Sequence, residues 1–257
     1  MVAPNGARLT KKDHPKLPVT VEEIVACARD CHVAGAGALH AHVRDINQVH
    51  VLDAGLYREL IDEMAVQAPG MHVQITTEAV GGYSPEEQRK LVRDVMPAAV
   101  SVSLSEMFSD GDRAAAIGFY QWAAAAGIAV QHIVYGADEF SHFIEMANPS
   151  GIPGGRRQVL FVLGRYAAGQ QSEPSDLEPF LEVLETEAAD LDIDWAVCAF
   201  GVRQQDCLLE AIRRGGKARV GFENGFWLGD GGTARENVSM VEDLVNRIAY
   251  ETRHWSS

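Results

Sequence analysis

Two histidines one residue apart are the clearest chemical feature of this sequence. His40 and His42 lie in the apolar run GALHAHV, which Arg44 and Asp45 follow directly. Residues i and i+2 of a β-strand point to the same face, so a strand here would project both imidazoles in one direction. Two imidazoles on one face indicate a metal site, and the alternative is a pair of core histidines with hydrogen bonds elsewhere.

A catalytic zinc site usually has three protein ligands and one open position, so a third ligand must come from another part of the chain. Glu223 in the segment RVGFENG is the best candidate, because its carboxylate ends the last apolar run with strand character. A carboxylate in that place could instead cap a helix or lie in an exposed loop. In a closed barrel the last strand lies near the early strands, which would bring Glu223 close to His40 and His42.

The segments that must position these residues alternate between short β-like runs and longer amphipathic patterns. The β-like runs cover residues 1–4, 36–43, 71–77, 98–104, 128–135, 159–163, 193–200 and 217–222. The helical patterns cover residues 20–33, 55–67, 85–95, 111–126, 137–147, 175–188, 203–213 and 234–252. This alternation predicts a single-domain (β/α)8 barrel over residues 1–257, with its active site at the carboxyl ends of the strands. An open doubly wound sheet is the alternative, but the early turn Asn5-Gly6-Ala7 lacks its glycine-rich phosphate fingerprint.

Three helix starts carry the capping-box pattern, a hydroxyl residue followed three residues later by glutamate. The pairs are Thr20 and Glu23, Ser84 and Glu87, and Thr233 and Glu236. They support helix starts near residues 20, 85 and 234.

Composition excludes several classes of partner. The formal net charge of −14 argues against nucleic acid as a ligand. No apolar run reaches the ~18 residues needed to span a membrane, and the first residues contain no apolar signal region. The four cysteines form no CxxC pair, which is typical of reduced thiols. We therefore expect a cytoplasmic protein without nucleic-acid or membrane partners.

The runs APNGARLTKKDHPKLPVTVEEI, AGALHAHVRD and RVGFENG, in this order, resemble the β-keto acid cleavage enzymes, the family that includes 3-keto-5-aminohexanoate cleavage enzyme. The likeness extends from residue 3 to about residue 250. It implies a zinc-dependent (β/α)8 barrel that converts a β-keto acid and acetyl-CoA into acetoacetate and a new acyl-CoA. It also implies a homo-oligomer, here a dimer or tetramer. By this resemblance His40, His42 and Glu223 are the zinc ligands.

The resemblance also implies residues that bind substrate. Arg219 matches the family's active-site arginine, which suits the anionic part of a substrate or intermediate. Thr76 or Thr77, and Ser101, fall near the threonine and serine with which the family holds its substrate. The Gly- and Pro-rich loop at residues 148–157 ends in two arginines that could border a CoA phosphate.

Two positions depart from the family pattern. Asn224 stands where the family has an aspartate that acts with the arginine to abstract a proton, and an amide cannot take a proton. General acid–base help is worth ~10²–10⁴-fold, so the condensation would be slow, would use another base such as Asp45, or would be replaced by a different reaction. Arg8 stands where the aminohexanoate enzyme has a glutamate for the substrate ammonium, and it predicts an anionic or neutral distal group.

Two other functions remain open from the residues. The HxH pair also opens the metal site of amidohydrolases, but the run VLFVLG lacks their histidine on strand six, and the last strand ends in Glu-Asn rather than in aspartate. A barrel that keeps its metal and binds a small acid without turning it over is the other alternative, because Asn224 replaces the acidic partner.

Overall fold

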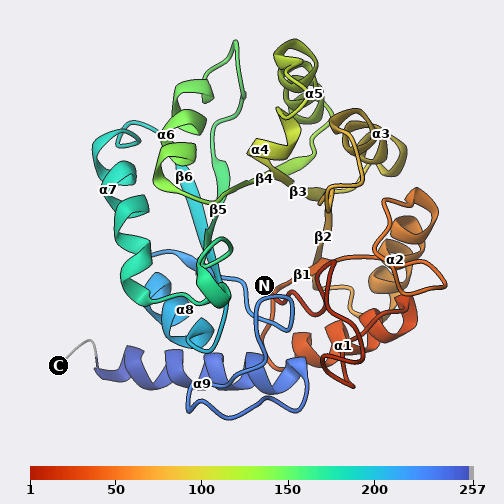
Figure 1. Ribbon diagram of the computed structural model, residues 1–257, viewed down its shortest axis with the longest axis vertical. Helices are drawn as coiled ribbons and strands as arrows, with labels where there is room; N and C mark the ends of the chain where they lie inside the picture. The colour runs from red at the N-terminus through yellow and green to blue at the C-terminus, as the bar shows by residue number, and fades with distance from the viewer. Residues whose placement is uncertain (255–257) are drawn as a thin grey trace.

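The computed structural model describes residues 1–254 and shows an α/β fold built on one curled parallel sheet (Figure 1). The sheet curls around the centre of Figure 1, and the helices lie outside it. Its strands are hydrogen-bonded in sequence order. They are β1 Ala38–Ala41, β2 His72–Thr76, β3 Ala99–Ser103, β4 Ala129–Val134, β5 Arg157–Leu163, β6 Ile193–Ala199 and β7 Lys217–Ala218.

The helices connect these strands and pack against the outer face of the sheet. They are α1 Val21–Val33, α2 Ala54–Gln67, α3 Pro85–Val95, α4 Leu104–Met107, α5 Arg113–Ala125, α6 Ala137–Met146, α7 Glu178–Thr186, α8 Gln204–Arg213 and α9 Asn237–His254, with 3-10 turns η1 Ala168–Gln170 and η2 Pro174–Leu177. Each predicted helix is present, with ends that differ by a few residues. The sequence did not predict α4 or the 3-10 turns. Among residues 1–254, no helix combines the length and the apolar character that crossing a bilayer requires.

The predicted eight-stranded sheet is present only in part, as seven strands. The segment 1–4 forms no strand, and Val2 instead makes isolated parallel bridges with Leu39 of β1 and with Val220 beyond β7. The predicted strand at 217–222 is also shorter: β7 ends at Ala218, Val220 makes only the isolated bridge, and the chain bends at Gly221, whose φ is 147°. A Cβ at Gly221 would lie 2.3 Å from the carbonyl oxygen of Ala3, so this close approach requires glycine.

Two of the predicted capping boxes are confirmed, at Thr20 before α1 and at Ser84 before α3. The third, at Thr233, is wrong. Thr233 pairs with Trp227 in an antiparallel bridge, and α9 begins only at Asn237. Thr233 therefore lies in an isolated bridge, and bends at Arg235 and Glu236 separate it from the helix, although its local sequence is that of a helix start.

Alternation along the strands decides which side chains reach the inside of the curled sheet. In β1, His40 lines the inner cavity, whereas Leu39 belongs to the main core between sheet and helices. In β4, Gln131 faces the inside and His132 faces the helices. A small apolar cluster fills part of the interior and consists of Ile133, Leu160, Val162, Ala196 and Cys198.

His132 should make the fold sensitive to acid. It is 4% exposed, and its ring packs against Tyr120 of α5 and Phe143 of α6, at centroid distances of 5.1 and 4.7 Å. Burial, with a smaller contribution from Arg157, lowers the pKa of His132 from 6.5 to about 3. The unfolded chain takes up a proton at this residue below pH 6.5, whereas the folded protein does so only near pH 3. The free energy of unfolding therefore falls as the pH drops through this window.

Between about pH 8 and about pH 4.5 this one group should remove roughly 2–3 kcal/mol of stability. Urea unfolding at both pH values measures the loss. A His132→Leu variant should lose less stability over the same interval by that amount. His142→Gln, which changes an exposed histidine of α6, is the control and should behave as the unaltered chain. An unchanged pH dependence in His132→Leu would contradict this account.

Candidate metal centre

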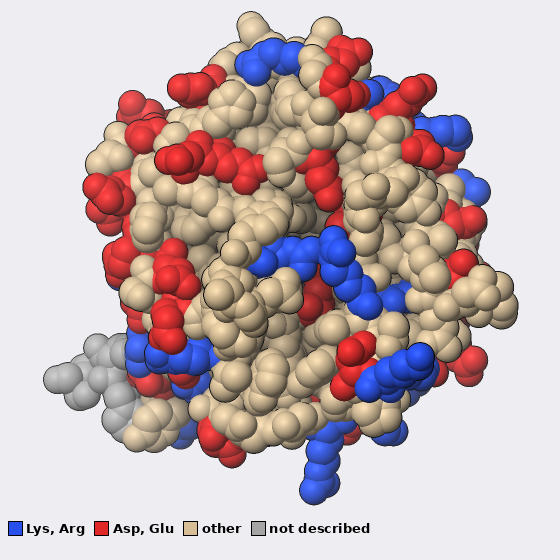
Figure 2. All heavy atoms as spheres, in the orientation of Figure 1, with Lys and Arg blue, Asp and Glu red and all other residues tan. Residues whose placement is uncertain are grey.

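A cavity of about 210 Å³ opens at the carboxyl ends of the strands. Its wall includes His40 and His42 from β1 and the residues that follow it, and Glu223 from the segment after β7. Figure 2 shows the hollow at the centre of the face formed by these loops, with Lys and Arg side chains gathered over it. Acidic side chains are spread around the periphery of the same face. The predicted metal ligands thus share one cavity on the expected side of the sheet.

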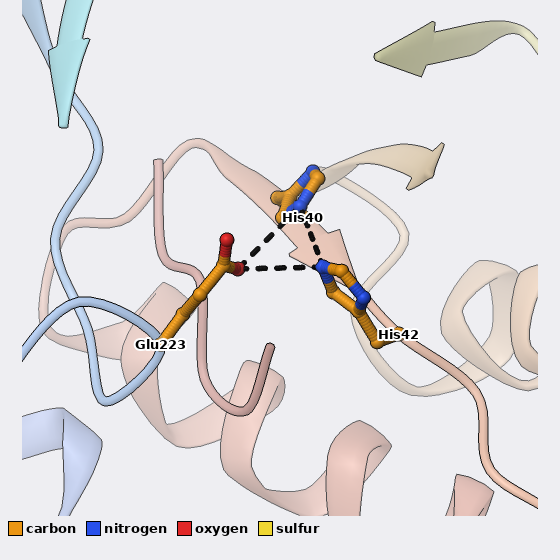
Figure 3. Close-up of side chains that lie close together, drawn as sticks. All are labelled: His40, His42 and Glu223. Atoms are coloured by element: carbon orange, nitrogen blue, oxygen red, sulfur yellow. Dashed lines mark hydrogen bonds and ion pairs between the residues drawn. The ribbon is translucent and has the colours of Figure 1, made fainter. Parts of the chain in front are cut away.

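The side chains of His40, His42 and Glu223 point toward one another (Figure 3). The two Nε2 atoms lie 3.1 Å apart, and each lies 3.5 Å from Glu223 Oε2. A tetrahedral zinc ion with bonds of about 2.1 Å holds its ligand atoms ~3.4 Å apart. Glu223 Oε2 has no hydrogen-bond partner within residues 1–254. This triangle of donor atoms fits one divalent ion.

The electrostatic environment prepares these groups for a cation. Burial opposes ionisation of Glu223, but the Arg219 guanidinium beside it outweighs burial and holds the pKa of the carboxyl well below its ordinary value. Arg219 Nη2 lies 3.0 Å from Glu223 Oε1 and is itself buried. Burial and then Arg219 lower the pKa of His40 to about 3. An ionised carboxylate and a neutral imidazole are the protonation states that metal binding needs.

The N-terminal segment holds the centre in place. Asn5 Nδ2 donates to the carbonyl of His42 at 2.8 Å, and Asn5 Oδ1 accepts from the His42 amide at 3.3 Å. Gly6 has φ 60°, and a Cβ there would lie 2.6 Å from Glu223 Cγ, so only glycine fits. Arg44 donates to the carbonyl of Gly6. Sequence reasoning missed these supporting roles, because contacts between distant segments leave no local pattern.

The predicted hydroxyl residues separate into two groups. Thr76 and Ser101 line the cavity, and Ser101 Oγ has no hydrogen-bond partner in the described part of the chain. Thr77 does not line it, since its hydroxyl donates to the carbonyl of Ser101 at 3.2 Å. Of the two threonines, Thr76 is therefore the one that lines the cavity.

Asn224 and Asp45 lie in different surroundings. Asn224 is 3% exposed and lines the cavity, and its side-chain amide has no hydrogen-bond partner within the described residues. Asp45 Oδ1 accepts hydrogen bonds from the backbone amides of Asn47 and Val49, both at 2.9 Å, and Asp45 is not among the residues that line the cavity. The structure therefore gives no support to Asp45 as a base, because its carboxylate stabilises a turn.

Two arginines stand at the cavity wall near its mouth. Arg8 lines the cavity and is exposed. Arg165, which the sequence analysis missed, also lines it and lies 3.7 Å from Glu78 and over the ring of Phe200 at 5.3 Å. Glu78, also missed, lies 3.7 Å from His42 Nδ1. Arg165 and Glu78 each follow the carboxyl end of a strand closely, and that position was the available signal.

The loop at residues 148–157 lies elsewhere. It leads into the amino end of β5, and the cavity lies at the opposite ends of the strands. Its last residue, Arg157, donates to the carbonyl of Ala147 at 3.1 Å. The CoA contact predicted for this loop therefore finds no support in the structure of this chain.

Several solved structures superpose on this chain over most of its length. A ternary complex of ObcA with a C4-CoA adduct and oxalate superposes with a TM-score of 0.69 at 15% identity, and covers 93% of this chain. This chain spans 65% of the length of ObcA. The 3-dehydroquinate dehydratase of Geobacillus kaustophilus superposes with a TM-score of 0.62 at 11% identity, over 98% of this chain and 91% of that one. At these identities the likeness concerns the fold.

Sequence relatives carry the comparison further. A 3-keto-5-aminohexanoate cleavage enzyme of Acetoanaerobium sticklandii is 27% identical over 96% of this chain and 89% of its own length. A 3-oxoadipate:acetyl-CoA acetyltransferase of Cupriavidus necator is 23% identical over 95% of this chain and 86% of its own length. The family model described as beta-keto acid cleavage enzyme matches residues 1–254. This chain therefore belongs to the beta-keto acid cleavage enzyme family.

Proposed function

We propose that this chain is a zinc-dependent enzyme that converts a β-keto acid and acetyl-CoA into acetoacetate and a new acyl-CoA. The observation that carries the proposal is the convergence of His40, His42 and Glu223, whose ligand atoms lie within 4.8 Å of one another in the cavity. Family membership and the relative that acts on 3-oxoadipate and acetyl-CoA support the same reaction.

The proposal includes a closed barrel, a homo-oligomeric assembly and a cytoplasmic location. We infer a single-domain barrel in which the segment around Val2 takes the place of the eighth strand, since Val2 bridges both Leu39 and Val220. Assembly into a dimer or tetramer and a cytoplasmic location stay predictions.

Zinc bound by His40, His42 and Glu223 would polarise the keto oxygen and stabilise the enolate charge as the carbon–carbon bond breaks. Arg219 would hold the substrate carboxylate or the developing anion. Its Nη2 is used toward Glu223, whereas Nε and Nη1 have no partner within residues 1–254. A buried guanidinium with unused donors binds an anion strongly, because the hydrogen bonds are charge-assisted.

The uncharged polar groups would orient the substrate. The Asn224 amide can donate to one substrate oxygen and accept from a hydroxyl, and Ser101 Oγ offers a further donor. Neither group can serve as a base at neutral pH. Of the other cavity carboxylates, Glu106 Oε2 accepts from the Ala79 amide and from Gln88. The Glu78 carboxylate lies 3.7 Å from Arg165 and 3.7 Å from His42 Nδ1, and it also lines the cavity where a substrate would bind.

The arginines at the mouth favour a substrate with an anionic distal group. Arg8 and Arg165 place two cations over the cavity of a protein whose formal net charge is −14. A cation in this position attracts a distal carboxylate and repels an ammonium group. We therefore propose a β-keto acid with an anionic or neutral end in preference to an amino-bearing one.

An activity screen tests the proposed reaction directly. The zinc-loaded protein is incubated with acetyl-CoA and a panel of β-keto acids that includes 3-oxoadipate and 3-keto-5-aminohexanoate. At least one acid should give equal amounts of acetoacetate and a new acyl-CoA, and Glu223→Gln should abolish both products. If no acid in the panel yields acetoacetate, the proposed reaction is wrong. Hydrolysis of amides or lactones without CoA would then favour the amidohydrolase alternative.

The role of Arg8 can be measured as a change in preference. Arg8→Glu should lower kcat/KM for the dicarboxylic acid relative to the amino-bearing acid by about tenfold or more, since about 1.4 kcal/mol of charge interaction suffices for that factor. Lys12→Glu makes the same charge change at an exposed residue that does not line the cavity. An equal ratio in the unaltered chain and in Arg8→Glu would remove Arg8 from the substrate site.

A further inference from the structure

Gln74 lies directly behind the candidate metal centre. It is on β2, pairs with His40 in the register of β1 and β2, and is 3% exposed. Its Oε1 lies 2.8 Å from His40 Nδ1, and its Nε2 donates to Gln131 Oε1 at 3.2 Å. Gln131 is on β4 and is 7% exposed, so the two amides form a buried polar row across the inside of the sheet.

We propose that Gln74 is a positioning residue that fixes the tautomer of His40 for metal binding. The Gln74 amide nitrogen is used toward Gln131, so its oxygen faces His40 and must accept a hydrogen bond from Nδ1–H. A neutral imidazole with its proton on Nδ1 carries its lone pair on Nε2. That nitrogen is the one that lies 3.5 Å from Glu223 Oε2. The inference rests on the metal centre of the proposed function.

The hydrogen bond between His40 Nδ1 and Gln74 also decides which of the two facing Nε2 atoms carries a proton. His40 Nε2 and His42 Nε2 are 3.1 Å apart, and two lone pairs or two protons at that distance would repel. With its proton on Nδ1, His40 presents a lone pair, so His42 Nε2–H can donate to it. A cation that binds at this point would meet a His40 that is already in the liganding tautomer.

Because His40 is buried, its Nδ1–H depends on Gln74 Oε1 as a hydrogen-bond acceptor. His40 is 1% exposed, so an Nδ1–H without an acceptor would be left buried and unsatisfied. Gln74 also lines a second cavity, of about 640 Å³, at the amino ends of the strands. A shortened side chain would admit water from that cavity to Nδ1. Leucine is therefore the sharper replacement, because it fills the space without offering an acceptor.

The first test is zinc affinity, measured on metal-free protein by competition with a chelating indicator and without substrate. Gln74→Leu should raise the Kd for zinc by about 10–100-fold, as the loss of an outer partner of a liganding histidine commonly does. Gln74→Glu keeps an acceptor and should retain the affinity of the unaltered chain. Gln158→Leu removes an amide that lines the same lower cavity and forms no hydrogen bond to His40 in the described part, so its Kd should not change.

The second test is the tautomer, read from ¹⁵N–¹H spectra of the histidine rings in metal-free protein. The signal of His40 is assigned by its loss in His40→Asn. It should show the proton on Nδ1 in the unaltered chain and a mixture of tautomers in Gln74→Leu. A proton on Nε2 in the unaltered chain, or an unchanged zinc Kd in Gln74→Leu, would overturn the proposal. Should Gln74→Leu fail to fold, the spectrum of the unaltered chain still decides it, because a proton on Nε2 of His40 would overturn the proposal. Neither readout uses the reaction, so a failed activity screen is distinguishable from a failed role for Gln74.

Discussion

The structure of the cavity depends on one buried ion pair, between Glu223 and Arg219. A carboxylate taken out of water loses several kcal/mol of solvation, and the loss is recovered only if a well-placed partner faces it. Arg219 supplies that partner at 3.0 Å from a position four residues earlier. Because one oxygen is held by the guanidinium, Oε2 is left pointing at His40 and His42. The ion pair between Arg219 and Glu223 therefore offsets the cost of burying the carboxylate and also leaves Oε2 available to a metal ion.

This constraint explains why the segment after β7 is held so closely by distant parts of the chain. Gln204 of α8 is fully buried, and its side chain accepts from the Gly221 amide at 2.9 Å and donates to the Gly221 carbonyl at 3.3 Å. The glycines at 6 and 221 allow backbone or side-chain contacts that a Cβ would block. On the other side, Asn5 binds both backbone groups of His42. A shift of about 1 Å in either segment would separate the three donor atoms.

Patterns between neighbouring residues in the sequence predicted those features of the site that depend only on local backbone geometry. The alternation of side chains along a strand placed His40 and His42 on one face, and the hydroxyl–glutamate spacing located the start of α1. Thr233 shows where such reasoning fails, because a bridge to Trp227 uses a residue that the local pattern assigned to a helix start. The side chains behind the cavity could not be predicted, since their partners are tens of residues away and only the curled sheet brings them together.

The central claim is that these three side chains bind one divalent ion, and anomalous diffraction at the zinc edge tests it most directly. Crystals of the unaltered protein grown with zinc should show one strong peak per chain, about 2.0–2.2 Å from His40 Nε2, His42 Nε2 and Glu223 Oε2. A peak bound by other residues, with these three side chains left uncoordinated, would contradict the account.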